Sequence, residues 1–126
     1  MSDEELKALY MHASAFLFPS ITEGFGLPPL EAMHCGCPVV ASTSGAMSEV
    51  CGDTVRYLDP DKPADWAASM EDLASDPTVR EKISARACDR AAKFTWRRAA
   101  MQLLQAIASA ENNSSLKAQL EALNAS

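Results

Sequence analysis

The sequence is poor in positive charge. It has 11 Lys and Arg against 17 Asp and Glu, which gives a formal net charge of -6. The basic residues form no run of the kind that nucleic acid or an anionic membrane surface attracts. We therefore expect no nucleic-acid partner, and a small molecule rather than a polyanion as ligand.

Long apolar runs are absent too. No stretch approaches the roughly 18 apolar residues of a membrane span. The start of the sequence lacks the basic and then apolar pattern of a secretory signal. We expect a chain without a transmembrane segment, located in the cytoplasm.

Cysteine is scarce, and its spacing is uninformative. Cys35, Cys37, Cys51 and Cys88 match no zinc-binding pattern. Disulfides or a metal site are one interpretation of four cysteines. We favour the other, in which they are small buried residues of a chain in a reducing cytosol. We expect no metal and no cofactor.

The chain has only 126 residues, which is enough for one domain at most. Its apolar residues indicate an α/β fold. Short apolar runs at residues 15–19, 38–42 and 55–60 are typical of strands in a parallel sheet. Helical patterns alternate with them and then take over after Pro60. The sequence predicts a partial doubly wound (Rossmann-like) parallel sheet of about three strands, with flanking helices and a helical C-terminal part. Residues 1–110 would form this domain, and residues 111–126 a polar tail that forms a short helix or frays.

Local signals predict where several helices begin and end. Ser2 and Glu5 form a capping-box pattern, and Asp76 precedes a proline at the first position of a helix. Gly36 ends the helix that follows the first strand, and a turn leads into a short helix that ends at Gly52. Helical spacing predicts buried stripes in the later helices, formed by Trp66, Ala67, Met70, Leu73 and Ala74, by Val79, Ile83, Ala87 and Ala91, and by Trp96, Ala99, Ala100, Leu103, Leu104 and Ile107.

The stretch TEGFGLPPLEAM (residues 22–33) carries the strongest functional signal. Glu23 follows the first strand by a few residues, at the edge of an open sheet where ligands bind. Glu31 lies about one turn into the next helix, whose start favours phosphate. Gly24 and Gly26 allow the backbone to approach a ligand. A diphosphate between two hydroxyl-rich groups, such as a nucleotide sugar, matches this arrangement.

Two other interpretations of the glutamates stay open. Each could be an ordinary solvated charge, Glu31 in a first helical turn and Glu23 on a loop. The pair could also be the acid and base of a hydrolase, although three strands hardly build the sugar cleft that this requires.

Several motifs occur together in one order: FPS, GFGLP, the segment EAMHCGCPVVAS, EVCGD and DP. Over residues 2–107, the sequence closely resembles the C-terminal nucleotide-sugar-binding domain of retaining GT-B glycosyltransferases, in particular glycosyltransferase family 4 (group 1). The resemblance implies that Glu23 serves catalysis by hydrogen-bonding the donor sugar, and that Glu31 holds the ribose hydroxyls. It assigns contacts with the sugar and its phosphates to the backbone N–H groups of Gly24, Phe25, Gly26 and Leu27. It also implies transfer with retention, without a metal.

The likeness covers about the last third of such an enzyme. No Arg or Lys matches the basic pair with which the family neutralises the diphosphate, and the first strands of the donor domain and the N-terminal acceptor domain have no counterpart. We therefore expect a truncated chain that is inactive by itself and needs the acceptor domain or its chain as partner. The alternative is a non-catalytic fragment that binds a nucleotide sugar weakly, packs against a partner, or self-associates through an exposed sheet edge.

Overall fold

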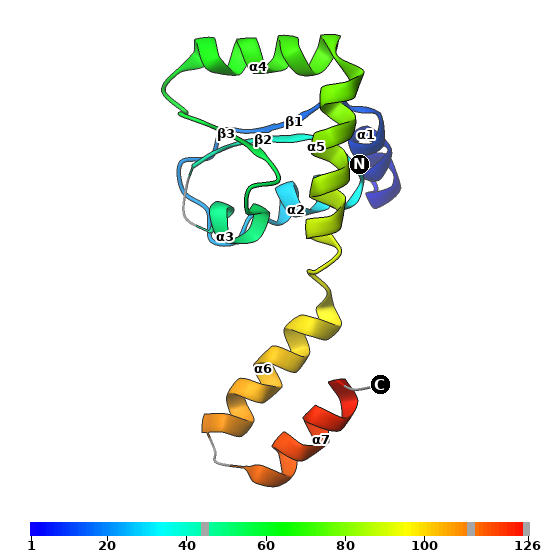
Figure 1. Cartoon of the computed structure of the whole chain (residues 1–126), viewed down its shortest axis with the longest axis vertical. Coiled ribbons are helices and arrows are strands. Elements are labelled where there is room, and N and C mark those ends of the chain that lie inside the picture. Colours follow the sequence, from blue (N-terminus) through cyan, green and yellow to red (C-terminus); the bar gives the residue numbers. More distant parts are fainter. Residues whose placement is uncertain (44–45, 111–112, 125–126) are drawn as a thin grey trace. The chain divides into compact units, whose positions relative to one another are not determined.

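The computed structural model describes residues 1–43, 46–110 and 113–124. The contacts divide it into two compact units, residues 1–93 and 94–126, which are described separately. The elements in Figure 1 are α1 (Asp3–His12), β1 (Phe16–Phe18), α2 (Leu27–His34), β2 (Val39–Ser42), α3 (Met47–Cys51), β3 (Arg56–Leu58), α4 (Pro63–Ser75), α5 (Pro77–Ala91), α6 (Trp96–Ala110) and α7 (Ser114–Asn124).

The strands of the first unit form a parallel sheet in the order β1-β2-β3. The predicted α/β fold, with three parallel strands, flanking helices and a helical C-terminal part, is confirmed. All of β2 is buried, whereas β1 and β3 are half-buried because each has a strand on only one side within the described sheet. The predicted turn before α3 falls at residues 44–45, outside the described residues. The division into residues 1–110 and a tail at 111–126 stays a prediction.

Local signals determine the helix ends as expected. Ser2 and Glu5 exchange both hydrogen bonds of a capping box, and the Asp76 carboxylate accepts from the N–H groups of Thr78 and Val79. Gly36 has φ +75°, which suits a residue just after a helix.

One face of the sheet packs against α4 and the start of α5. Val40, Trp66 and Leu73 form a buried cluster, against which other apolar residues pack from β1, β3 and α5. The Trp66 indole donates to the Asp59 carbonyl at 2.9 Å, so its one polar group is satisfied. Burial of these side chains fastens α4 to the sheet.

The other face meets α2 and α3. Phe16 packs edge-on against Tyr10 of α1, with ring centroids 5.3 Å apart. The Tyr57 hydroxyl lies 2.9 Å from the carbonyls of Met47 and Gly52, at the two ends of α3. The last turns of α5 reach this layer, because Ser84 donates to the Gly36 carbonyl at 2.7 Å and Arg90 Nε to the Val50 carbonyl at 2.9 Å. These bonds hold α2 and α3 in place beside the sheet.

Two of the predicted buried stripes are corrected. In α4, Trp66 and Leu73 are buried, but Ala67, Met70 and Ala74 are exposed. Ser69 is buried in their place, because it lies on the same helical face as Trp66 and Leu73. Arg56 of β3 donates to its hydroxyl at 3.0 Å and to Asp72 at 2.8 Å. In α6, the whole predicted stripe is exposed: Trp96, Ala99, Ala100, Leu103, Leu104 and Ile107. The helix α7 packs on a different flank of α6, around the buried Ala108.

The α5 stripe is confirmed. Ala87 and Ala91 are fully buried, and Val79 and Ile83 pack against the cluster under α4. All four cysteines carry free thiols; Cys37 and Cys51 are buried, and Cys35 and Cys88 are half-buried. None of the helices described is long and apolar enough to cross a bilayer.

Candidate functional site

The loop after β1 is tied to the carboxyl end of β2. The Ser42 hydroxyl, in the last residue of β2, donates to the carbonyl of Ser20. The Ser20 hydroxyl in turn lies 3.2 Å from the Thr22 carbonyl and 3.3 Å from Glu23 Oε1, and its one proton is shared between these two acceptors. These bonds form a chain from the central strand to the first glutamate of the motif. Glu23 is half-buried, so its carboxylate is held by the protein and still open to solvent.

Gly26 sets the direction in which the chain leaves this loop. It is the N-terminal cap of α2, with φ +89°, a backbone conformation that costs other residues about 1–2 kcal/mol. A Cβ added at Gly26 would lie 2.6 Å from Sδ of Met47, whose side chain is fully buried. Both the conformation and the space therefore require glycine. The contact also places the start of α3 directly against the loop.

The start of α2 offers fewer hydrogen-bond donors than an ordinary helix. Pro28 and Pro29 have no N–H, and the Leu30 N–H already donates to the Gly26 carbonyl at 3.3 Å. Any further N–H groups at this end of α2 belong to Leu27 and to the loop before it.

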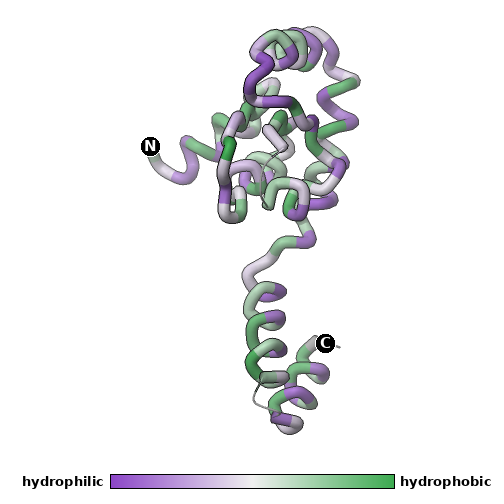
Figure 2. The backbone as a smooth tube through the Cα atoms, turned by 90° about the vertical axis from the view of Figure 1, so that its left-hand side faces the viewer, coloured by the Kyte–Doolittle hydropathy of each residue, from purple (hydrophilic) through white to green (hydrophobic). Residues whose placement is uncertain are grey.

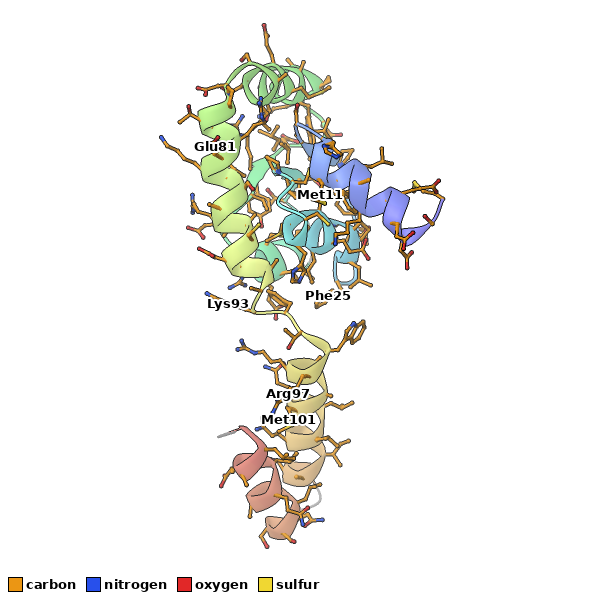
Figure 3. The ribbon with its side chains drawn as sticks, turned by 90° about the vertical axis from the view of Figure 1, so that its right-hand side faces the viewer. Met11, Phe25, Glu81, Lys93, Arg97 and Met101 are labelled. Carbon is orange, nitrogen blue, oxygen red and sulfur yellow. The ribbon has the colours of Figure 1, made fainter. Side chains whose placement is uncertain are left out.

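Three of the four loop residues 24–27 are exposed to solvent, whereas Gly26 is buried. Gly24 has open space where a side chain would stand, and Phe25 and Leu27 are 46% and 50% exposed. Figure 3 labels Phe25 at the edge of the first unit. The exposed Phe25 provides an apolar surface beside the exposed Gly24 and the half-buried Glu23, and small-molecule sites commonly combine apolar surface with a few polar groups.

Glu31 stands on the solvent side of α2, one turn after Leu27. Burial raises the pKa of Tyr10, and the negative charge of the nearby Glu31 raises it further. Glu31 therefore lies toward α1, while Glu23 lies toward the end of β2. Among the described residues, no hydrogen bond joins the two glutamates; they are two separate acceptors on one loop–helix segment.

The arginines of the first unit are engaged elsewhere. Arg56 and Arg86 form ion pairs of 2.8 Å with Asp72 and Asp53. Arg80 donates to carbonyls at the end of α4, and Arg90 to the carbonyls of Glu49 and Val50. These guanidinium groups hold the fold together. In the part of the chain that the structure describes, no cluster of His, Cys, Asp and Glu could hold a metal ion.

Sequence reasoning missed the supports of the site: Ser20, Ser42 and Met47. Ser20 follows β1, and Ser42 is the last residue of β2. Polar residues at the carboxyl ends of neighbouring strands are typical of ligand sites, so this pattern could have indicated both serines. Met47 gave no signal, because its role depends on the packing of α3 against Gly26.

The model of the family described as "Glycosyl transferases group 1" matches residues 1–90 of the chain. The chain belongs to the group 1 glycosyl transferases. The family prediction is thus confirmed, and the site residues lie inside the matched segment.

Curated group 1 relatives are considerably longer than this chain. The O-antigen chain mannosyltransferase B of Escherichia coli is 40% identical over 104 residues, which are 82% of this chain and 27% of that enzyme. The D-inositol 3-phosphate glycosyltransferase of Paenarthrobacter aurescens is 39% identical over 103 residues, or 80% of this chain and 25% of the relative. The chain therefore spans about a quarter of the length of these enzymes.

A solved structure has the same fold. Sucrose-phosphate synthase from Thermosynechococcus elongatus matches with a TM-score of 0.79 and 27% identity. The match covers 90% of this group 1 chain and 29% of the synthase.

Proposed function

We propose that residues 23–27 and Glu31 hold the nucleotide-sugar donor of a retaining glycosyltransferase. The observation that carries the proposal is the chain of hydrogen bonds from Ser42 through Ser20 to Glu23. It supports a half-buried carboxylate after the carboxyl end of β1, directly before the loop of Gly24 and Gly26. Ligands of open α/β sheets bind at this edge.

Each part of the site matches one part of the donor. The Glu23 carboxylate accepts hydrogen bonds from hydroxyls of the sugar, and Glu31 accepts from the ribose hydroxyls. The N–H groups of residues 24–27 donate to the diphosphate between them. Because Pro28 and Pro29 donate nothing, the phosphates would lie over the loop rather than over the axis of α2.

The leaving diphosphate needs more positive charge than this site supplies. Electrostatic stabilisation of the leaving group lowers the barrier of such a transfer, but Arg56, Arg80, Arg86 and Arg90 are all engaged in structural contacts. We therefore assign donor holding to this chain, with the cations coming from a segment upstream of the motif and the acceptor site from an N-terminal acceptor domain or its chain. We expect the chain by itself to bind the donor and to transfer no sugar.

The relatives suggest which donor to test first. Several are named as mannosyltransferases. GDP-mannose is therefore the first probe, with UDP-glucose as a second donor that differs in both sugar and base.

Calorimetric titration of the chain with each donor tests the proposal. A hydrogen bond to a charged group contributes about 1.5–3 kcal/mol, so Glu23→Gln and Glu31→Gln should each weaken binding by about tenfold or more. Glu81→Gln is the matched control, because Glu81 is exposed on α5 and Figure 3 shows it at the opposite end of the unit from Phe25. Equal affinities of the Glu23, Glu31 and Glu81 variants would contradict the proposal.

The second candidate is a non-catalytic chain that binds a nucleotide sugar weakly or packs against a partner. The engaged arginines favour it, and so does the edge of β1, which faces no second strand among the described residues. A transfer assay with GDP-mannose, a simple mannoside acceptor and an added N-terminal acceptor domain separates the candidates. Turnover that requires both chains and is lost in Glu23→Gln would overturn the non-catalytic alternative; turnover by this chain alone would overturn both candidates.

A further inference from the structure

A single tyrosine hydroxyl contacts both ends of the short helix α3. Tyr57 is the middle residue of β3, and its hydroxyl oxygen lies 2.9 Å from the carbonyl oxygens of Met47 and Gly52. Met47 is the first residue of α3, and Gly52 follows its last residue. The hydroxyl has one proton, which these two acceptors share. Figure 1 shows α3 beside α2 on the side of the sheet away from α4, and Figure 2 shows the same layers after a quarter turn.

The helix α3 depends on such contacts because it is too short to be stable alone. It has five residues, whereas isolated helices shorter than about 12 residues are marginal in water. Arg90 Nε donates to the Val50 carbonyl at 2.9 Å, and the Thr54 hydroxyl donates to the Cys51 carbonyl at 2.6 Å. These two bonds hold the last residues of α3. The Tyr57 hydroxyl reaches its first residue as well.

The first residue of α3 is also the one that touches the loop of the candidate site. The Met47 side chain is fully buried, and its Sδ and Cε atoms lie 2.6 and 3.4 Å from the position that a Cβ of Gly26 would occupy. Protein interiors are close-packed, so a displacement of Met47 either displaces Gly26 or opens a gap beside it. The contacts therefore run from the Tyr57 hydroxyl to the Met47 backbone, and from the Met47 side chain to Gly26.

The strand β3 holds Tyr57 itself in place. Tyr57 pairs with Ala41 in the fully buried strand β2. Successive side chains of a strand point to opposite faces of the sheet. Arg56 accordingly points to α4, where it donates to the Ser69 hydroxyl, and Tyr57 points to α3. Burial raises the pKa of Tyr57 to about 12, so the hydroxyl keeps its proton at neutral pH.

We propose that Tyr57 is a positioning residue for the donor loop, because its hydroxyl holds Met47 against Gly26 and thereby sets the backbone of residues 24–27. The identity of the ligand rests on the proposed function. Loss of the hydroxyl releases the start of α3, and the loop then adopts further backbone conformations. A donor must reorder these conformations when it binds, which costs affinity. Binding therefore weakens although every residue of the loop is unchanged.

Nuclear magnetic resonance of the full chain tests the effect on the loop without any ligand. Tyr57→Phe keeps the ring and removes the hydroxyl, and it should shift or broaden the signals of the Met47 methyl group and the Gly26 amide. Loss of one methyl signal in Met47→Leu assigns the former. Thr54→Val is the matched control, because it removes a hydroxyl that donates to a carbonyl at the other end of α3. It should leave both signals in place. An unchanged Gly26 signal in Tyr57→Phe, or equal changes in the tyrosine and threonine variants, would overturn the proposal.

Calorimetric titration with GDP-mannose tests the effect on the donor. Tyr57→Phe should weaken binding by about threefold to tenfold, the size of a typical net hydrogen bond. Thr54→Val should change the affinity by less than about twofold. Equal affinities of the two variants would overturn the role of Tyr57 in donor binding. If the wild-type chain binds neither GDP-mannose nor UDP-glucose, the proposed function fails, and the magnetic resonance comparison decides by itself whether Tyr57 positions Gly26.

Discussion

The Ser20 hydroxyl lies 3.3 Å from a carboxylate oxygen of Glu23 and shares its proton between that oxygen and the Thr22 carbonyl, which is 3.2 Å away. Ser20 itself is held by Ser42 at the end of the buried strand β2. The orientation of Glu23 thus depends on the pairing of β1 with β2, rather than on the loop alone. A carboxylate held in this way loses less side-chain freedom when it binds a ligand.

Removing this support should weaken donor binding without unfolding the protein. In Ser20→Ala, Glu23 keeps its charge but loses its hydrogen-bond donor. A neutral-to-charged hydrogen bond contributes about 1.5–3 kcal/mol, and solvent replaces part of it at a half-exposed site. We expect the affinity for GDP-mannose to fall about threefold to tenfold, less than in Glu23→Gln, as measured by calorimetry. Ser75→Ala, which removes an exposed hydroxyl at the end of α4, is the control. Equal affinities of the two serine variants would show that Ser20 does not orient Glu23.

Gly26→Ala should destabilise the first unit and disturb the loop. The left-handed backbone costs alanine about 1–2 kcal/mol, and the new Cβ would meet the buried side chain of Met47. We expect the free energy of unfolding to fall by about 1–3 kcal/mol in urea titrations.

The neighbouring glycine provides the matched control. Gly24 has no positive φ, and a Cβ there would meet nothing within 4 Å. Gly24→Ala should therefore change the stability by less than about 0.5 kcal/mol. Equal losses of stability in Gly24→Ala and Gly26→Ala would show that neither the backbone conformation of Gly26 nor its packing against Met47 requires glycine at position 26.

The parts of the fold that local chemistry decides could be predicted from the sequence. The capping pair Ser2 and Glu5, the cap Asp76 and the helix end at Gly36 each act within a few residues. The strands were found because short apolar runs between helices favour a parallel sheet. The place of Glu23 at the sheet edge followed from the general position of ligand sites in this architecture.

Features that depend on distant contacts could not be predicted. The bond from Ser42 to Ser20 requires the register of β1 with β2, and the hydrogen-bond partner of the buried Ser69 is Arg56 of β3, distant in sequence. The α6 stripe was expected to face inward because it is the most apolar face of that helix. Periodicity identifies such a face but does not say what covers it.

Alkaline pH should destabilise the first unit. Burial raises the pKa of the Cys37 and Cys51 thiols from about 9 to about 11, and that of Tyr57 from about 10 to about 12. All three are neutral when protonated. Between pH 9 and 12 the folded protein therefore retains protons that the unfolded chain has released, and the free energy of unfolding falls as pH rises. Below pH 9 these groups contribute no slope.

Urea titrations followed by circular dichroism at pH 8, 9, 10 and 11 under reducing conditions measure this effect. Each fully shifted cysteine should contribute a loss of up to about 1.4 kcal/mol per pH unit above pH 9. Cys51→Ala removes one of the two thiols and should lower the slope between pH 9 and 11 by about half. Tyr57→Phe should leave the slope between pH 9 and 10 nearly unchanged and reduce the slope above pH 10. A stability that stays constant up to pH 11 would mean that Cys37 and Cys51 are not buried as the structure has them.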